Sequence, residues 1–170
     1  MKRLVAYFSC SGITREYALK LAKEIHADVY EIKPETPYSS ADLNWMDKNS
    51  RSSLEMKDKS SRPEVVLDDF DFSKYEEIFV GYPVWWYTAP TIINTFLEAH
   101  DFSGKTIILW ATSGSSGLGS SKKDLSVSTK AKIVEGDVLN HGQKFAEFIA
   151  NLTPKIGLKF TKFCHQFCLV

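Results

Sequence analysis

The feature that most constrains the fold is the start of the chain, where a buried strand, a polar turn and a helix follow one another directly. Residues 4–8 (Leu-Val-Ala-Tyr-Phe) are all hydrophobic, which predicts a strand covered on both faces. Residues 9–14 (Ser-Cys-Ser-Gly-Ile-Thr) form a hydroxyl-rich turn, and hydrophobic residues then recur at helical spacing with Thr14 in the capping position. Such a turn gathers hydroxyls and backbone N–H groups at the positive end of a helix dipole. The start of the chain therefore predicts a site for a phosphate group.

The predicted phosphate site has no basic side chain before Arg15, so dipoles and hydroxyls would hold the phosphate. Phosphatases with a nucleophilic cysteine use an arginine that follows the cysteine after five intervening residues. Here four residues separate Cys10 from Arg15, and Glu16 occupies the position where the arginine is needed. A carboxylate there repels phosphate, so we do not expect Cys10 to act in phosphate transfer. Residues 114–119 also miss the P-loop pattern, because Ser120 replaces its lysine.

The rest of the chain alternates between strand-like and helix-like segments. The strand-like segments are residues 28–32, 78–82, 106–111 and, more weakly, 131–134. Amphipathic helices are expected over residues 14–25, from Pro90 through Leu97, and over residues 145–152. Residues 34–62, here called the excursion, are polar, and we expect them to be irregular with about one helix. The alternation predicts an α/β fold with a parallel sheet and helices on both faces.

The length of 170 residues suits a single domain, which we assign to residues 1–152, and leaves residues 153–170 as a C-terminal tail of unknown role. The formal net charge is zero and no hydrophobic run approaches a membrane span, so neither nucleic acid nor membrane is an expected partner. The chain has 3 cysteines, an odd number that favours a reducing compartment and predicts a cytoplasmic protein. In the tail, Cys164, His165 and Cys168 are too few to make a zinc site, so no metal is expected.

Three of the predicted turns follow buried strands, where ligands bind in parallel sheets of this kind. They are residues 9–14, 83–89 and 112–117. The first and third turns are rich in Ser, Thr and Gly, whereas the second contains an aromatic run at residues 85–87 (Trp-Trp-Tyr). A phosphate-binding turn beside an aromatic wall suits a ligand with one phosphate and one large flat ring system. Flavin mononucleotide, FMN, has both groups.

The same turns resemble the flavin-binding loops of the flavodoxin family. Residues 7–14 (Tyr-Phe-Ser-Cys-Ser-Gly-Ile-Thr) are similar to the flavodoxin phosphate loop, whose pattern is roughly T/S-x-T/S-G-x-T. Residues 81–86 (Gly-Tyr-Pro-Val-Trp-Trp) and 112–117 (Thr-Ser-Gly-Ser-Ser-Gly) resemble the other two loops. The likeness extends to residues 42–45 and 49–53 and covers most of residues 3–150, and it is greatest to short bacterial flavodoxin-like proteins. It implies a doubly wound, five-stranded flavodoxin fold with FMN bound noncovalently.

The resemblance assigns the FMN phosphate to the first turn, at Ser9, Ser11, Gly12, Ile13 and Thr14. It assigns the isoalloxazine ring to the second turn, at Pro83, Val84, Trp85, Trp86 and Tyr87. The third turn would line the other side of the ring with Thr112, Ser113 and Gly114, and Gly117 would lie near its pyrimidine edge. The protein would supply binding, orientation and electrostatics, without a catalytic acid or nucleophile of its own. Because adjacent residues of an extended segment point to opposite sides, we expect at most one of Trp85 and Trp86 to face the ring.

The balance of charge separates two functions within this family. Flavodoxins that carry electrons to protein partners are strongly acidic, whereas this chain has no net charge and an isoelectric point of about 6.9. We therefore expect an NAD(P)H-dependent oxidoreductase that acts on quinone-like or other small acceptors. A flavodoxin-type electron carrier between protein partners stays the alternative, and a module that has lost FMN is a third. We expect Lys122, Lys123, Lys130 and Lys132 to form a solvated face, with attraction of NADPH phosphates as the alternative. A homodimer through the aromatic segment and the tail is left open.

Overall fold

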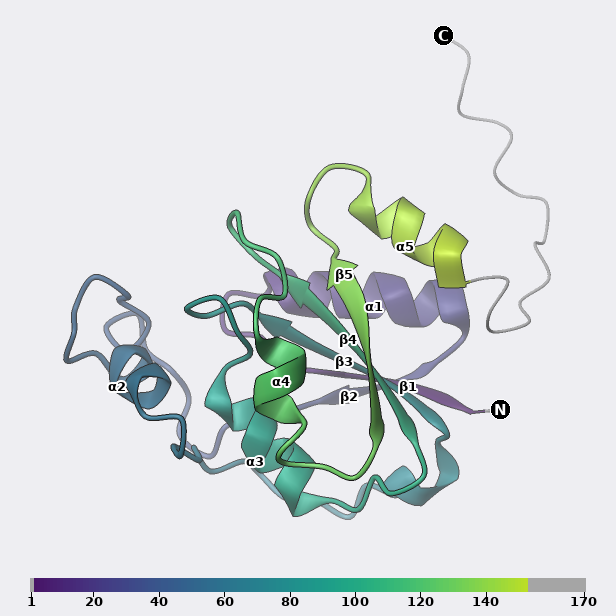
Figure 1. Ribbon diagram of the computed structural model, residues 1–170, viewed down its shortest axis with the longest axis horizontal. Coiled ribbons are helices and arrows are strands. Elements are labelled where there is room, and N and C mark those ends of the chain that lie inside the picture. The colour runs from purple at the N-terminus through teal and green to yellow at the C-terminus, as the bar shows by residue number, and fades with distance from the viewer. Residues whose placement is uncertain (1, 153–170) are drawn as a thin grey trace, which may run out of the picture.

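Five parallel strands form the central sheet of the computed structural model, which describes residues 2–152 (Figure 1). Across the sheet the strands follow the order β2-β1-β3-β4-β5. In chain order the strands are β1 (Arg3–Tyr7), β2 (Asp28–Glu31), β3 (Glu77–Pro83), β4 (Thr106–Thr112) and β5 (Lys132–Val138). The helices are α1 (Ile13–Ile25), α2 (Arg51–Lys57), α3 (Thr91–Ala99), α4 (Ser121–Leu125) and α5 (Lys144–Leu152), with a short 3₁₀ helix over Phe72–Lys74. The expected doubly wound α/β fold is confirmed.

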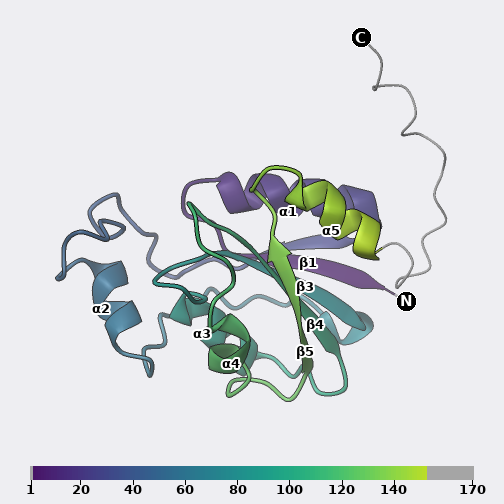
Figure 2. The same ribbon diagram turned by 45° about the horizontal axis from the view of Figure 1, so that its top comes forward.

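The strand order reverses beside β1, because the chain first moves outward to β2 and then crosses back past β1 to β3. Helices α1 and α5 cover one face of the sheet, and α3 and α4 cover the other (Figure 2). The connections that leave β1 and β3 therefore diverge to opposite faces. Ligand sites in open α/β sheets lie at such a point, outside the carboxyl ends of the strands.

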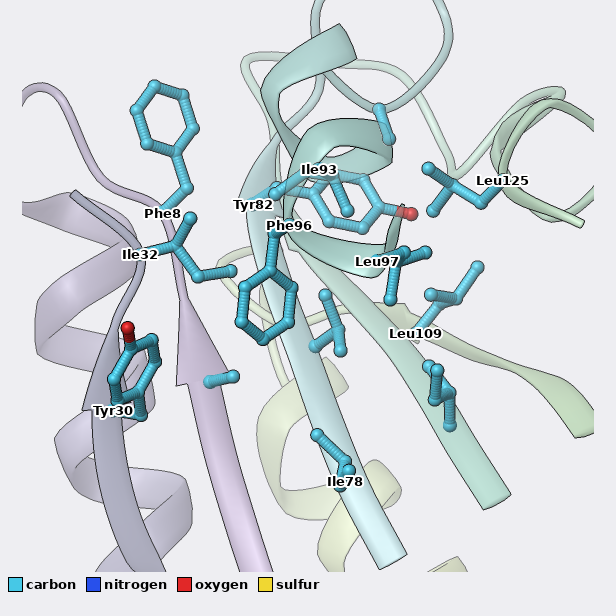
Figure 3. Close-up of a cluster of buried hydrophobic side chains, with 14 of the residues drawn as sticks. Phe8, Tyr30, Ile32, Ile78, Tyr82, Ile93, Phe96, Leu97, Leu109 and Leu125 are labelled. Atoms are coloured by element: carbon cyan, nitrogen blue, oxygen red, sulfur yellow. The ribbon is translucent and has the colours of Figure 1, made fainter. Parts of the chain in front are cut away.

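Strand side chains alternate between two hydrophobic layers. Figure 3 shows one layer, in which Ile93, Phe96 and Leu97 of α3 lie against the strands and Leu125 approaches from α4. In the other layer, the fully buried Trp110 of β4 is paired in register with Gly81 of β3. A Cβ atom at Gly81 would lie 2.0 Å from Cζ2 of Trp110, so this glycine leaves the space that the indole ring fills. Each residue of the pair lies two residues before the end of its strand, so their packing holds β3 and β4 together next to the carboxyl ends where the ligand is predicted.

The predicted elements are present, with three differences. Helix α1 begins at Ile13 and its N-cap is Gly12, so the prediction that Thr14 caps the helix is wrong; Thr14 is buried in the first turn. Pro90 precedes α3 as its N-cap residue instead of lying within its first turn. Strand β5 extends beyond the weak strand predicted over residues 131–134, because pairing with β4 outweighs the polar residues 135–137. The sequence pattern had not indicated α4 or the 3₁₀ helix.

The excursion between β2 and β3 lies beyond the carboxyl ends of the central strands, where Figure 1 shows α2 at the left of the molecule. An antiparallel bridge between Pro34 and Val65 closes its base, and the backbone N–H of Glu35 donates to the carbonyl of Glu64 over 3.0 Å. As expected, this segment contains about one helix. Within the described residues, no helix is long and apolar enough to cross a membrane. The tail assigned to residues 153–170, with its two cysteines, lies outside the described part of the chain.

Candidate functional site

A cavity of about 520 Å³ opens at the carboxyl edge of the sheet. Its lining comes from the loop after β1, the loop after β3 and the excursion. The residues are Cys10, Ser11, Leu43, Trp45, Ser52, Pro83, Val84, Trp85, Trp86 and Tyr87. All ten of these side chains are uncharged, and four of them are aromatic. A concave, aromatic and uncharged surface suits a flat ring system.

The loop after β1 has the chemistry expected of an anion site. Gly12 has a left-handed φ of 87°, and its backbone N–H donates to Oγ of Ser9 over 3.1 Å. No side chain caps α1, so a bound anion can accept hydrogen bonds from the N–H groups of its first turn. The charge of Glu16 in this turn is paired with Lys20, whose Nζ lies 2.6 Å from Oε1 of the glutamate. Ser11 is exposed beside the helix end and free to face a ligand.

The structure shows one hydrogen bond for the hydroxyl of Thr14, and its predicted contact with a phosphate stays a prediction. Its Oγ1 lies 2.7 Å from Oγ1 of Thr112, and both side chains are buried. The carbonyl of Thr112 also accepts a hydrogen bond of 2.9 Å from the backbone N–H of Val84. Thr112 therefore joins the three loops that follow β1, β3 and β4. These are the three loops that the sequence assigned to one ligand, and the structure brings them together.

The loop after β3 contains a tight turn in a strained conformation. Trp85 and Thr88 exchange two backbone hydrogen bonds of 3.0 Å, and the two residues between them have left-handed φ values of 46° (Trp86) and 64° (Tyr87). Positive φ at both central residues is the pattern of a type I′ turn, which normally contains Asn-Gly. Bulky residues in this conformation cost roughly 1–3 kcal/mol each and cluster at functional sites.

The two tryptophans of this turn lie in different surroundings. The indole of Trp85 packs edge-on against Phe8 at 5.8 Å and against Tyr38 at 5.4 Å between ring centroids. Trp86 is 45% exposed and Tyr87 is 74% exposed, and both border the cavity. The turn is not extended, so the alternation argued from an extended segment does not apply to it. Trp85 anchors the turn, whereas Trp86 and Tyr87 are presented at the mouth of the cavity.

The loop after β4 is built around Ser113. The Oγ of Ser113 accepts a hydrogen bond of 2.9 Å from the backbone N–H of Ser116. The side chain of Asn140 accepts from the backbone N–H of Ser113 and donates to the carbonyl of Ser113, both over 2.9 Å. Gly114 and Gly117 are exposed, with open space around both. This loop adjoins the cavity through Thr112 but does not line it, and its contact with a ring stays a prediction. No pattern in the sequence indicated the two hydrogen bonds between Asn140 and Ser113.

The excursion supplies a wall that the predicted site residues did not include. Leu43, Trp45 and Ser52 line the cavity. Two signals in the sequence pointed to this segment, namely a tryptophan in a polar stretch and the resemblance to flavodoxins there. Behind the wall, the guanidinium of Arg51 lies 4.0 Å from the ring centroid of Tyr38 and donates to Oε1 of Glu55 over 2.7 Å. The guanidinium of Arg51 is therefore already paired.

Cys10, which the sequence left without a role, also lines the cavity. Burial raises the pKa of its thiol to about 12, and Glu55 adds to the rise while Arg51 opposes it. The thiol is protonated at neutral pH, and only the thiolate is a strong nucleophile. Cys10 therefore contributes an apolar surface to the cavity.

Comparisons with known proteins agree with this architecture. A candidate flavoprotein from Bacteroides eggerthii is 43% identical, with 93% of this chain and 99% of that chain covered and a TM-score of 0.84. A second, from Bacteroides uniformis, is 40% identical, with 90% and 97% covered and a TM-score of 0.79. A flavoprotein from Lactobacillus acidophilus, solved in complex with FMN, shares the fold at 23% identity, with 79% and 90% covered and a TM-score of 0.59.

Among curated proteins, none matches this chain. Residues 2–152, which are all of the residues that the structure describes, match the family model for flavodoxin. The strand order, the three loops at the carboxyl edge and the solved relatives agree with that match. This chain belongs to the flavodoxin family.

Proposed function

We propose that this chain binds FMN noncovalently at the carboxyl edge of its sheet and acts as an NAD(P)H-dependent oxidoreductase on quinone-like or other small acceptors. The observation that supports this most directly is the uncharged, aromatic-walled cavity that begins beside the uncapped N-terminus of α1. Membership of the flavodoxin family supports the same cofactor, as does the FMN bound in the Lactobacillus acidophilus relative.

The residues present fit both ends of FMN. At the phosphate end, Ser9 and Ser11 supply hydroxyls, and Gly12 lets the ligand approach the backbone because no atom occupies the space around it. Thr14 contributes by fixing this loop to Thr112, since its hydroxyl is already bonded there.

At the ring end, Trp85 holds the second loop against Phe8, and the rings of Trp86 and Tyr87 cover the mouth of the cavity. When bound, FMN supplies a ring system that accepts and passes on electrons or a hydride. The protein binds and orients that ring, and its apolar walls keep water away from it. Backbone amide groups of the loops would determine which redox state of the bound ring is favoured.

An oxidoreductase is favoured over an electron carrier because the lining of the cavity and the chain as a whole have no net charge. A carrier that meets basic protein partners uses an acidic rim to attract them. A small, neutral acceptor needs no such field and enters an apolar cavity readily. One observation supports the carrier instead, namely the exposure of Trp45 (71%), Met46 (73%) and Tyr87 (74%) around the cavity, which is typical of a contact surface for a protein.

An absorption spectrum of the protein after addition of FMN and desalting tests the cofactor. We expect retained bands at about 370 and 450 nm, which belong to oxidised flavin. Ser11→Ala is expected to weaken FMN binding, whereas Ser103→Ala, an exposed serine beyond the C-terminal end of α3, is the matched control. Loss of all flavin on desalting, with no binding in a direct titration, would refute the proposal.

Addition of NADPH under anaerobic conditions then tests the reaction. Rapid bleaching of the flavin bands, followed by saturable NADPH oxidation when a quinone is added, is the result expected of an oxidoreductase. Bleaching by dithionite alone, with no turnover, would replace this proposal with the electron carrier.

A further inference from the structure

The carboxylate of Asp124 in α4 joins three segments: the loop after β3 and the excursion, which line the cavity, and the loop after β4, which adjoins it. Its Oδ2 accepts hydrogen bonds from Oγ1 of Thr88 (2.9 Å) and Oγ of Ser120 (2.6 Å). Its Oδ1 accepts from Nζ of Lys59 at 3.3 Å. Thr88 closes the Trp85–Thr88 turn, Ser120 ends the loop after β4, and Lys59 lies in the excursion just after α2.

The backbone of Asp124 is itself fixed to the body of the protein. The side-chain amide of Asn94 in α3 donates to the carbonyl of Asp124 over 3.0 Å and to Oγ of Ser128 over 2.9 Å. Asn94 is only 5% exposed, so this link is buried. The carboxylate therefore projects from a rigid point between two packed helices toward the loops.

The turn that Asp124 contacts needs support from outside. Trp86 and Tyr87 both have left-handed backbones, which bulky residues keep only where their surroundings hold them. The backbone N–H of Ser120 donates to the carbonyl of Tyr87 over 3.0 Å, and a Cβ atom at Gly119 would lie 1.8 Å from that same oxygen. The loop after β4 is thus pressed against the turn, and Asp124 bonds to side chains on both sides of the contact.

The charge of Asp124 is maintained by its partners. Burial opposes its ionisation, but the hydrogen bonds from Ser120, Thr88 and Lys59 outweigh burial and bring its pKa below the ordinary value. The carboxylate is ionised at neutral pH and accepts all of these hydrogen bonds. Hydrogen bonds to a charged group are about twice as strong as those between neutral groups.

We propose that Asp124 is a positioning residue that holds the Trp85–Thr88 turn, and with it the rings of Trp86 and Tyr87, at the wall of the cavity. It acts through Thr88 and Ser120 and does not touch the ligand. This inference rests on the proposed function, because it assigns the positioned rings to the FMN site.

The test compares Asp124→Asn with a matched control, Asp71→Asn. Asp71 likewise accepts hydrogen bonds from a neighbouring serine, Ser73, at 2.9 and 2.6 Å, but it lies before β3 and far from the carboxyl edge. Three properties are measured well below the unfolding temperature: near-ultraviolet circular dichroism of the FMN-free protein, the Kd of FMN, and the absorption spectrum of bound FMN. For Asp124→Asn we expect an altered aromatic signal and roughly tenfold weaker FMN binding, the effect of losing about one charged hydrogen bond. Asp71→Asn is expected to change none of the three.

A second pair of variants separates positioning from folding. Thr88→Val removes the hydroxyl that Asp124 binds and keeps the shape of the side chain, whereas Thr88→Ser keeps the hydroxyl. We expect Thr88→Val to show the same altered spectrum and weaker FMN binding as Asp124→Asn. Thr88→Ser should keep the spectrum and the FMN affinity of the wild type. This pair decides the question if Asp124→Asn does not fold.

The outcomes distinguish this inference from the proposed function. If the wild type binds no FMN, the proposed function fails, and the circular dichroism of the FMN-free variants alone decides whether Asp124 holds the turn. If Asp124→Asn lowers only the unfolding temperature, with the Kd, the spectrum and the aromatic signal unchanged, Asp124 is a structural residue and the inference is overturned. Equal behaviour of Thr88→Val and Thr88→Ser would overturn it as well.

Discussion

Two turns at the same edge of the sheet reach left-handed backbone conformations in opposite ways. The turn after β1 does so at Gly12, with a φ of 87° and no atom within 4 Å of the position that a Cβ would take. The turn after β3 does so at Trp86 and Tyr87, with φ values of 46° and 64°. Glycine adopts this conformation without steric cost, whereas large side chains do not. Under the proposed function, the first turn binds the phosphate through its backbone and hydroxyls, and the second keeps a strained backbone that presents its rings to the ligand.

The two turns also differ in what supports them. The first is held by a hydrogen bond within the turn, from Gly12 to Ser9, and by the bond between the hydroxyls of Thr14 and Thr112. The second is held from outside, by the contact of Gly119 and Ser120 with the carbonyl of Tyr87. Each prediction below tests one side of this comparison, from the largest expected effect to the smallest.

The largest effect is expected from an added methyl group where the second turn meets its support. In Gly119→Ala, the new Cβ would lie 1.8 Å from the carbonyl oxygen of Tyr87, on a residue with a φ of 55°. The backbone must shift, so we expect the free energy of unfolding to fall by about 3 kcal/mol or more. Gly12→Ala meets no neighbouring atom and should lose only about 1–2 kcal/mol, from backbone strain alone. Urea unfolding of both variants measures the difference, and equal losses would mean that the second turn is not pressed against its support.

The second prediction replaces the strained pair by the residues that a type I′ turn favours. The double variant Trp86→Asn with Tyr87→Gly should raise the free energy of unfolding by about 1–2 kcal/mol, because it relieves two left-handed aromatic residues. The same variant should bind FMN more weakly, since it removes both rings from the cavity mouth. Urea unfolding and an FMN titration are measured on one preparation. A variant that is less stable than the wild type would show that the rings contribute more packing than the backbone loses in strain.

Much of this fold could be predicted from the sequence, because its strands are continuous hydrophobic runs and its long helices are amphipathic. The runs at residues 4–8, 78–82 and 106–111 became the three central strands, which are buried on both faces. The edge strand β5 was underestimated, because Gly136 and its polar neighbours give no strand signal. A Cβ at Gly136 would lie 2.2 Å from the carbonyl oxygen of Leu109, so the glycine is required by close pairing with β4.

The candidate site could be predicted in outline but not in its contacts. The three loops were identified because each follows a buried strand, and strand ends meet at one edge in a parallel sheet. The bond between Thr14 and Thr112 joins residues 98 positions apart, and nothing in either local pattern indicates it. The turn at Trp86 and Tyr87 was equally hidden, because a left-handed turn is normally recognised by Gly or Asn. Long-range contacts hold both features, and local sequence patterns do not contain them.

The third prediction concerns that long-range bond. Thr14→Val keeps the shape of the side chain and removes the hydroxyl, which leaves Oγ1 of Thr112 buried without this partner. We expect the free energy of unfolding to fall by about 1–2 kcal/mol. Thr14→Ser, which retains the hydroxyl, should lose less from this bond and serves as the control. If Thr14→Val weakens FMN binding without any loss of stability, the hydroxyl serves the ligand directly, as the sequence first indicated.

The smallest effect is expected from Cys10. It tests whether the side of the first turn that faces the core excludes water, as close packing of that turn requires. Burial disfavours the thiolate and raises the pKa of the thiol to about 12 in the folded protein, whereas the pKa of an unfolded thiol is about 8.5. Since the folded pKa is the higher one, the stability linked to this thiol is fully present below about pH 8.5 and is lost as the pH rises toward 12. The side chain is partly exposed, so we expect a modest loss of about 0.5–1 kcal/mol in the free energy of unfolding between pH 7.5 and pH 10.

The Cys10→Ala variant should lack this part of the loss. Both proteins also carry Cys164→Ser and Cys168→Ser, which remove the other thiols. Comparing this protein with its Cys10→Ala counterpart also cancels the ionisation of the buried tyrosines, whose pKa values burial raises as well. If the free energy of unfolding has the same pH dependence in both proteins, water reaches the thiol of Cys10. The first turn would then be solvated on the side that faces the core as well as on its exposed side.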